Sequence, residues 1–203
     1  MTSKKTNNAH HHGDLRNALV QAGMELLTEG GVSALTLRGC AAKAQVSHAA
    51  PKHHFKDLAA LREAVALECF VAFNQSLLDA IENGGSAPTE QLHSICRGYL
   101  DFAIKQPAYF DAIFSMGSLV SFSTDLGEQS PTAYETLAKV CSHFVTKERD
   151  ALTVETQVWA LIHGYSQLVR MGRFNEHTEA ARDAPPSEGP FDQVMALLQH
   201  LAD

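Results

Sequence analysis

The side chains with the clearest chemical purpose lie between Thr36 and Lys56, where cationic and hydrogen-bonding residues are concentrated. Arginine, lysine and histidine can hold phosphates, and hydroxyl, amide and imidazole groups can reach base edges in a major groove of DNA. The small Ala49 would allow close approach to a base edge or a thymine methyl group. We expect DNA contacts from ten residues: Thr36, Arg38, Gln45, Ser47, His48, Ala49, Lys52, His53, His54 and Lys56.

Two short helices joined by a tight connection would present this segment. The sequence predicts one helix over 37–43, a connection over 44–46 and a second helix over 47–54, with Ser47 as its N-cap. A longer helix is predicted on either side, over 14–29 and 58–82. In such a helix-turn-helix the second short helix enters the major groove. A helical hairpin that only packs on a core would show the same polar face, and spacing alone does not separate the two interpretations.

The rest of the chain also has helical periodicity and no strand-like alternation of any length. Further helices are predicted over 89–105, 108–116, 132–149, 151–172 and 191–201. The expected fold class is therefore all-α, with about nine helices. We expect a flexible basic arm over 1–13, a three-helix DNA-binding domain with a helix-turn-helix over 14–57, and an effector-binding and dimerisation domain over 58–203.

Charge is distributed unevenly along the 203 residues. The chain has a net charge of −7, which by itself argues against nucleic acid as a partner. Residues 1–66, however, hold eight Lys and Arg against five Asp and Glu, whereas the remainder holds eight against eighteen. A basic head and an acidic body suit a protein that touches DNA at one end, although acidic enzymes can also have a basic end.

Catalytic, metal and membrane chemistry have little support. Cys40, Cys69, Cys96 and Cys141 are scattered without zinc-like spacing and are expected to be reduced. No phosphate loop or nucleophile elbow is present, so we expect no enzyme and no cofactor. The histidines at 10–12 could bind a metal, but a basic arm near DNA fits them better. No stretch approaches the length of apolar sequence that spans a bilayer, and we expect a cytoplasmic protein.

The segment around the two short helices resembles the signature of the TetR family of transcriptional regulators. The matching residues are Gly30-Gly31, Leu35-Thr36-Leu37-Arg38, Ala41, and the run from Gln45 to Asp57. In the second half, Trp159-Ala-Leu-Ile-His163-Gly164 resembles the Trp-x-x-x-His-Gly element of one subgroup. The resemblance covers the first 75 residues well and the remainder at scattered points.

Four positions depart from the family pattern or complicate it. Gln45 replaces a turn glycine, so it must adopt a positive φ or the turn must differ. Lys52 replaces a phosphate-binding tyrosine, and Leu58 replaces a lysine. Pro51 removes an early hydrogen bond from the second short helix and could bend it.

The resemblance implies a helical body with an effector cavity and a dimer interface. The apolar stripes over 151–172 and 191–201 could pair with their copies as a four-helix bundle, or could both be internal core. An apolar or aromatic effector would suit candidate pocket residues, each of which could equally be plain core packing. These are Phe70, Phe73, Phe102, Tyr109, Phe110, Phe114, Trp159, His163 and Gln167.

Together these features predict a homodimeric regulator that reads a palindromic operator in double-stranded DNA. Repression, relieved when a small effector moves the helix over 58–82, is the default interpretation, and activation is not excluded. His163 could contact the effector or be structural. The competing hypotheses are a helical ligand-binding dimer without DNA binding and a helical enzyme.

Overall fold

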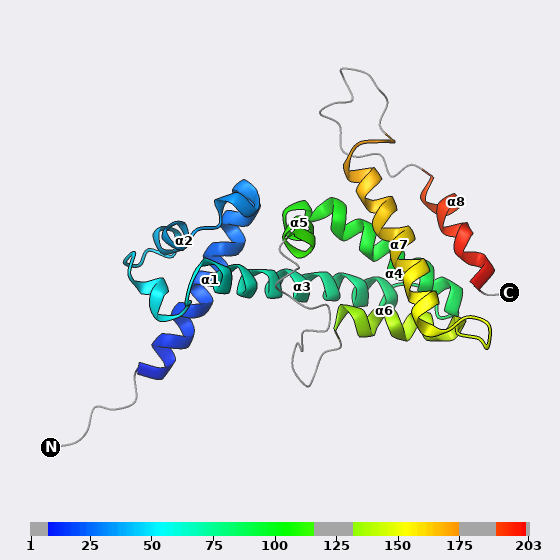
Figure 1. Cartoon of the computed structure of the whole chain (residues 1–203), viewed down its shortest axis with the longest axis horizontal. Helices are drawn as coiled ribbons and strands as arrows, with labels where there is room; N and C mark the ends of the chain where they lie inside the picture. Colours follow the sequence, from blue (N-terminus) through cyan, green and yellow to red (C-terminus); the bar gives the residue numbers. More distant parts are fainter. Residues whose placement is uncertain (1–7, 116–131, 175–189, 202–203) are drawn as a thin grey trace. The chain divides into compact units, whose positions relative to one another are not determined.

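The computed structural model describes residues 8–115, 132–174 and 190–201. Over these residues the chain forms eight α-helices and short 3-10 turns, and no strand. Figure 1 shows how the helices follow one another along the chain. The all-α expectation is therefore confirmed. The chain divides into two compact units: Met1–Phe70 with Ala108–Ser121, called here the head unit, and Val71–Pro107 with Phe122–Asp203, called the body unit.

In the head unit, the long first helix α1 (Asn8–Ala34) packs against the short α2 (Leu37–Lys43). Helix α1 is broken at Gly30 and Gly31, where Gly31 takes a φ of 68°. This break lies where the sequence predicted the helix to end, because glycine reaches positive φ without a steric penalty. Helix α1 begins earlier than expected, so residues 8–13, assigned above to a flexible arm, are helical.

Helix α3 (Leu58–Glu82) has the bounds that the sequence predicted. The Asp57 carboxylate accepts the backbone N–H of Ala60 at 2.9 Å and so caps its first turn. Among the described helices, α3 alone has the length and apolar composition of a membrane span, where we expected none. Core helices share that composition, and Leu61 and Val65 on this helix are fully buried in protein.

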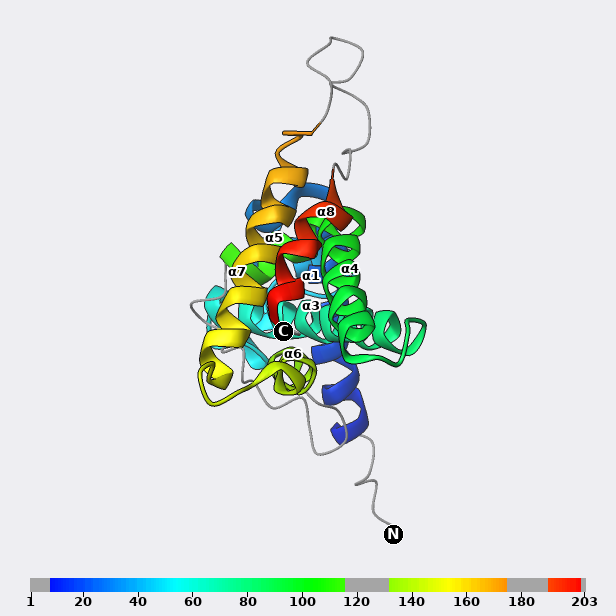
Figure 2. The same ribbon diagram turned by 90° about the vertical axis from the view of Figure 1, so that its right-hand side faces the viewer.

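Four further helices build the body unit: α4 (Pro88–Lys105), α6 (Ala133–Cys141), α7 (Ala151–Arg170) and α8 (Phe191–Met195). Helices α4 and α7 pack side by side, as Figure 2 shows, and α6 packs against both. Their shared core includes Leu100 and Val158, both fully buried. The helix expected over 108–116 is α5 (Pro107–Ser115), which belongs to the head unit from Ala108 onwards.

The predicted end of the helix over 132–149 is wrong. Helix α6 ends at Cys141 and one 3-10 turn reaches only to Phe144, not to Arg149. The Thr146 hydroxyl instead accepts the N–H groups of Glu148 and Arg149, each at 3.2 Å, and this turn leads into the Asp150 cap of α7.

The last predicted helix is α-helical only in α8. It continues as a 3-10 helix over Ala196–Leu201, whose end is held by Arg149. The Arg149 guanidinium donates to the carbonyls of His200 at 2.7 Å and Leu201 at 3.0 Å. The connections between the predicted helices over 117–131 and over most of 174–190 lie outside the described residues.

Candidate nucleic-acid interface

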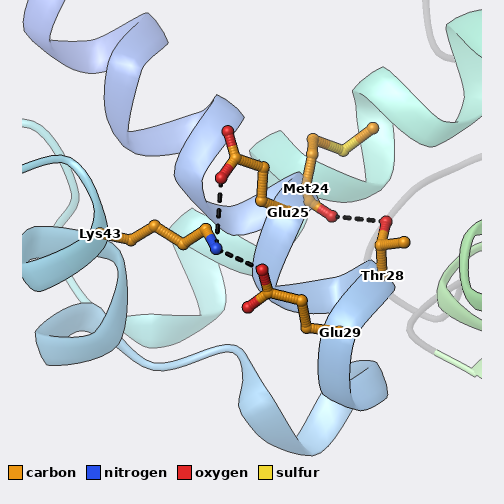
Figure 3. A network of polar contacts seen from close by, with 5 residues as sticks. All are labelled: Met24, Glu25, Thr28, Glu29 and Lys43. Carbon is orange, nitrogen blue, oxygen red and sulfur yellow. Dashed lines mark hydrogen bonds and ion pairs between the residues drawn. The ribbon is translucent and has the colours of Figure 1, made fainter.

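Helix α2 is fixed at both ends. At its start, Thr36 is the N-cap, because its hydroxyl accepts the N–H of Gly39 at 3.0 Å. At its end, Lys43 reaches two glutamates on α1, as Figure 3 shows: Nζ lies 3.3 Å from Glu25 and is hydrogen-bonded to Glu29. Lys43 therefore holds α2 on α1, and its charge is matched within the head unit.

The turn after α2 has the strained residue that the sequence predicted. Gln45 has a φ of 57°, and it is the only described residue other than glycine with a positive φ. The backbone N–H of Val46 then returns to the carbonyl of Ala41 at 2.9 Å, which closes the turn. Of the two alternatives left open above, the chain therefore keeps the family-type turn and tolerates the strain at Gln45.

Relief of this strain should stabilise the head unit. Gln45→Gly is expected to raise the free energy of unfolding by about 1 kcal/mol, because left-handed backbone costs a side-chain-bearing residue roughly that much. Ala44→Gly is the matched control, since Ala44 has an ordinary φ of −74° and should gain nothing. Urea titrations followed by circular dichroism would measure both, and a less stable Gln45→Gly protein would contradict the expectation.

The second short helix differs from its prediction. It is a 3-10 helix of four residues, Ala50–His53, in place of an α-helix over 47–54, and no side chain caps it. The reason is Pro51, which has no N–H to donate to the carbonyl of Ser47 and whose ring would clash with that carbonyl in an α-helix. The Ser47 carbonyl instead accepts from Ala50 at 3.0 Å, and the bonds from Lys52 to Ala49 and from His54 to Pro51 have the same three-residue spacing. We call residues 47–55 the recognition segment.

The recognition segment is held by its apolar side. Phe55 is 2% exposed and Pro51 is buried, while Val46 and Ala50 are half-buried. The Arg16 guanidinium, from α1, lies 5.3 Å from the centre of the Phe55 ring, a cation–π distance. Sequence reasoning missed Pro51 as an anchor, although its apolar ring in this segment was a visible signal.

Nine of the ten predicted DNA-contact residues are exposed, and His54 is half-buried. They are therefore available to a ligand along one continuous stretch of chain. Arg38, Lys52 and Lys56 have no ion-pair partner among the described residues, in contrast to Lys43. An exposed row of uncompensated cations beside hydroxyl and imidazole groups is the arrangement that phosphate and base contacts require.

The predicted pocket residues divide between the two units. Phe70, Tyr109, Phe110 and Phe114 lie in the head unit, where the Phe110 and Phe114 ring centres are 4.6 Å apart. Phe73, Phe102, Trp159, His163 and Gln167 lie in the body unit.

In the body unit a buried residue that the sequence did not single out joins several of these side chains. The Tyr99 hydroxyl is 2.8 Å from His163 Nδ1, and the Phe73 ring contacts Tyr99 and Phe102 at centre distances of 5.1 and 5.2 Å. Burial raises the pKa of Tyr99 and lowers the pKa of His163, and the charge of Arg170 lowers the latter further.

Metal ligation finds no support in the part of the chain that the structure describes. It holds no group of three His, Cys, Asp or Glu side chains that could bind an ion. The four cysteines are free and buried, and burial raises the pKa of Cys96 to about 12. The side chains of the histidines at 10–12 lie outside the described residues.

Comparisons with known proteins agree with this architecture. Residues 92–186 match the family model described as "Tetracyclin repressor-like, C-terminal domain". An uncharacterised HTH-type transcriptional regulator of Bacillus subtilis, YobS, is 21% identical over 169 residues, which are 82% of this chain and 85% of that protein.

Solved structures give the same result for the fold. A protein of unknown function from Rhodococcus sp. RHA1 superposes with a TM-score of 0.67 at 24% identity, covering 96% of each chain. The multidrug binding protein EbrR, solved with imidazole, superposes with a TM-score of 0.64 at 15% identity, covering 99% of this chain and 97% of its own. The chain thus carries a tetracyclin repressor-like C-terminal domain behind a helix-turn-helix head, and over most of its length it is similar to an HTH-type transcriptional regulator.

Proposed function

We propose that this protein is a cytoplasmic repressor that binds a palindromic operator as a homodimer and releases it when a small molecule binds the body unit. The observation that carries the proposal is that Arg38, Lys52 and Lys56 of the helix-turn-helix are exposed and have no ion-pair partner among the described residues. These cations would hold phosphates on either side of the groove, while Ser47, His48 and Ala49 would meet base edges. A bound dimer would block transcription sterically, which favours repression over activation.

The exposed face of α7 supports dimerisation. Leu152, Leu168 and Met171 are 71%, 44% and 67% exposed on it, and Leu197 of the last helix is 63% exposed. Solvent-exposed apolar surface on neighbouring helices is typical of an interface between two copies of the same chain. Both stripes also bury their other faces, at Val158 and Leu198 for example, so they serve the core and could serve the dimer.

Aromatic side chains in the body unit support an effector of small size. Phe73, Phe102 and Tyr99 form one ring cluster beside the polar groups of His163 and Gln167. Apolar walls with a few converging polar groups are typical of small-molecule sites. The structural neighbour EbrR is a multidrug binding protein, in keeping with this interpretation. Effector binding would release DNA only by favouring a conformation of the dimer that does not fit the operator.

A direct test measures binding to the DNA that flanks the gene. Fluorescence anisotropy over a salt series should give a steep loss of affinity with salt, with a slope of about −0.9 per phosphate neutralised. Lys52→Ala should weaken binding to all sequences and reduce that slope by about 2 for a dimer, one unit per copy of the lysine.

The matched control is Lys147→Ala, which removes an exposed lysine from the body unit and should leave the slope unchanged. If Lys52→Ala and Lys147→Ala give the same dependence of DNA affinity on salt concentration, or if the affinity does not depend on salt, the operator-binding assignment is wrong. A protein that binds ligands as a dimer but never binds DNA would give that result.

A further inference from the structure

A chain of polar side chains links α4 and α7 inside the body unit. Tyr99, 6% exposed, has its hydroxyl 2.8 Å from His163 Nδ1, and this hydroxyl also takes a hydrogen bond from the ring N–H of Trp159. On the other side of the imidazole, Gln167 Nε2 lies 3.5 Å from His163 Nε2. Arg170 Nη1 then donates to Gln167 Oε1 at 3.5 Å. We call these five residues the Tyr99–His163 array.

The array is rich in donors and positive in charge. The indole of Trp159 and the guanidinium of Arg170 can only donate hydrogen bonds. From Thr156 to Arg170, helix α7 contains no acidic residue, and Arg170 supplies its one formal charge. This local balance is opposite to that of the chain as a whole, whose net charge is −7. The charge of Arg170 acts on His163 directly, since it lowers the pKa of the imidazole.

The array is also accessible on one side and apolar on the other. In the protomer His163, Gln167 and Arg170 are half-buried and Trp159 is 36% exposed, so the protomer's own core does not close off these polar groups. Behind them, Tyr99 packs edge-on against Phe73 at 5.1 Å between ring centres, and Phe73 packs on Phe102 at 5.2 Å. A ligand with an anionic group could meet the polar groups while its apolar body lies on the exposed indole of Trp159, and the buried rings behind them hold the array in place.

We infer that the Tyr99–His163 array binds the carboxylate of a small organic acid whose remainder is aromatic or aliphatic. The inference rests on the proposed function, because it names the chemical class of the effector. Arg170 and His163 would hold the carboxylate oxygens, and Tyr99 is a positioning residue that fixes the imidazole.

Proton uptake should accompany binding. The free protein holds His163 with a lowered pKa, so the imidazole is neutral at neutral pH. A carboxylate beside it favours the charged form and raises its pKa in the complex. Affinity for the acid should therefore increase as the pH falls through the pKa of His163 in the complex and should level off below its pKa in the free protein, and an uncharged ligand should show no such increase.

The chain's one tryptophan makes the test direct. Trp159 belongs to the array, so its fluorescence reports binding without any need for DNA. The probes are phenylacetate, phenylacetamide and 2-phenylethylamine, which keep one ring and change the charge of the polar group. We expect phenylacetate to change the fluorescence with a dissociation constant at least about tenfold below those of the other two. Equal responses to all three, a preference for the amine, or no response to phenylacetate at millimolar concentration would overturn the inference.

Variants separate contact from folding. Arg170→Gln is expected to abolish the preference for phenylacetate over phenylacetamide, and Tyr99→Phe to reduce it and flatten the pH dependence. Arg173→Gln, an exposed arginine just beyond the same helix, is the matched control and should keep the preference. Sedimentation of each variant shows whether the array instead stabilises the dimer; a change of oligomeric state without a change in phenylacetate affinity would overturn the inference.

The two proposals fail in different ways. If phenylacetate binds as expected but the protein does not bind the DNA that flanks its gene, the regulator assignment is wrong and the assignment of the carboxylate site still holds. If the protein binds that DNA with a steep salt dependence but Trp159 responds equally to acid, amide and amine, the acid site is wrong and operator binding stands.

Discussion

A Gly164→Leu protein is expected to be monomeric and to bind operator DNA at least about 100-fold more weakly than the parent, because two linked half-site contacts become one. Gly164 lies in the middle of α7, where glycine costs about 1 kcal/mol relative to alanine. A Cβ built at this position meets no atom of the chain within 4 Å. Nothing inside the described protomer therefore requires a glycine here, whereas a helix of a second copy crossing at Gly164 would.

The surroundings of Gly164 fit such a crossing. The residues one turn away on either side are Ala160, which is exposed and small, and Leu168, which is 44% exposed. Small residues let two helix backbones approach, and larger apolar residues around them fill the rest of the contact. The interface would be centred on the middle of α7, where a leucine side chain would hold the two helices apart.

Sedimentation velocity and anisotropy would measure both effects of Gly164→Leu. Circular dichroism is the control for folding, since leucine is the better helix former and the monomer should not lose helix. Gly164→Ala should weaken the dimer by less, because it adds only one methyl group. If Gly164→Leu sediments as a dimer and binds operator normally, α7 is not the dimer interface.

Helix bounds could be predicted from sequence where local chemistry decides them. Helices α2 and α3 have their predicted bounds because Thr36 and Asp57 cap them through their own side chains. Gly31 breaks α1 for an equally local reason, since its φ is 68°. Such signals are complete within a few residues of chain, so periodicity and caps suffice.

The recognition segment shows where that method fails. Pro51 was visible in the sequence, but its effect was taken as a bend, whereas it excludes the α-helix from the whole of 47–54. Ser47 could cap a helix only if an α-helical turn followed it. The loss of that turn therefore overturned both the element type and the cap.

Long-range pairings could not be predicted. Tyr99 and His163 are 64 residues apart in the chain, and the sequence around either residue does not predict that the other is its hydrogen-bond partner. The bidentate contact of Arg149 to the carbonyls of His200 and Leu201 is hidden for the same reason. Sequence reasoning placed His163 among polar candidates by its helix position, but only the packing of α4 against α7 supplies its partner.

Phe55→Ala is expected to abolish operator binding while the body unit stays folded. The recognition segment has one 3-10 turn and no side-chain cap, so its position depends on its apolar anchors. Phe55 is 2% exposed and carries the Arg16 guanidinium over its ring, so truncation removes both the packing and the cation–π contact. Loss of a buried phenylalanine costs about 3–5 kcal/mol, which a four-residue helix cannot recover.

The two units can be followed separately in this variant. Trp159 lies in the body unit, so its fluorescence should keep the parent spectrum while anisotropy shows no binding to the operator. Phe55→Leu is the matched control, since it keeps an apolar anchor and should retain most of the affinity. An operator affinity of Phe55→Ala within about threefold of the parent would mean that the segment is positioned by its backbone turn alone, because a misplaced reading segment loses its base contacts at about 1–3 kcal/mol each.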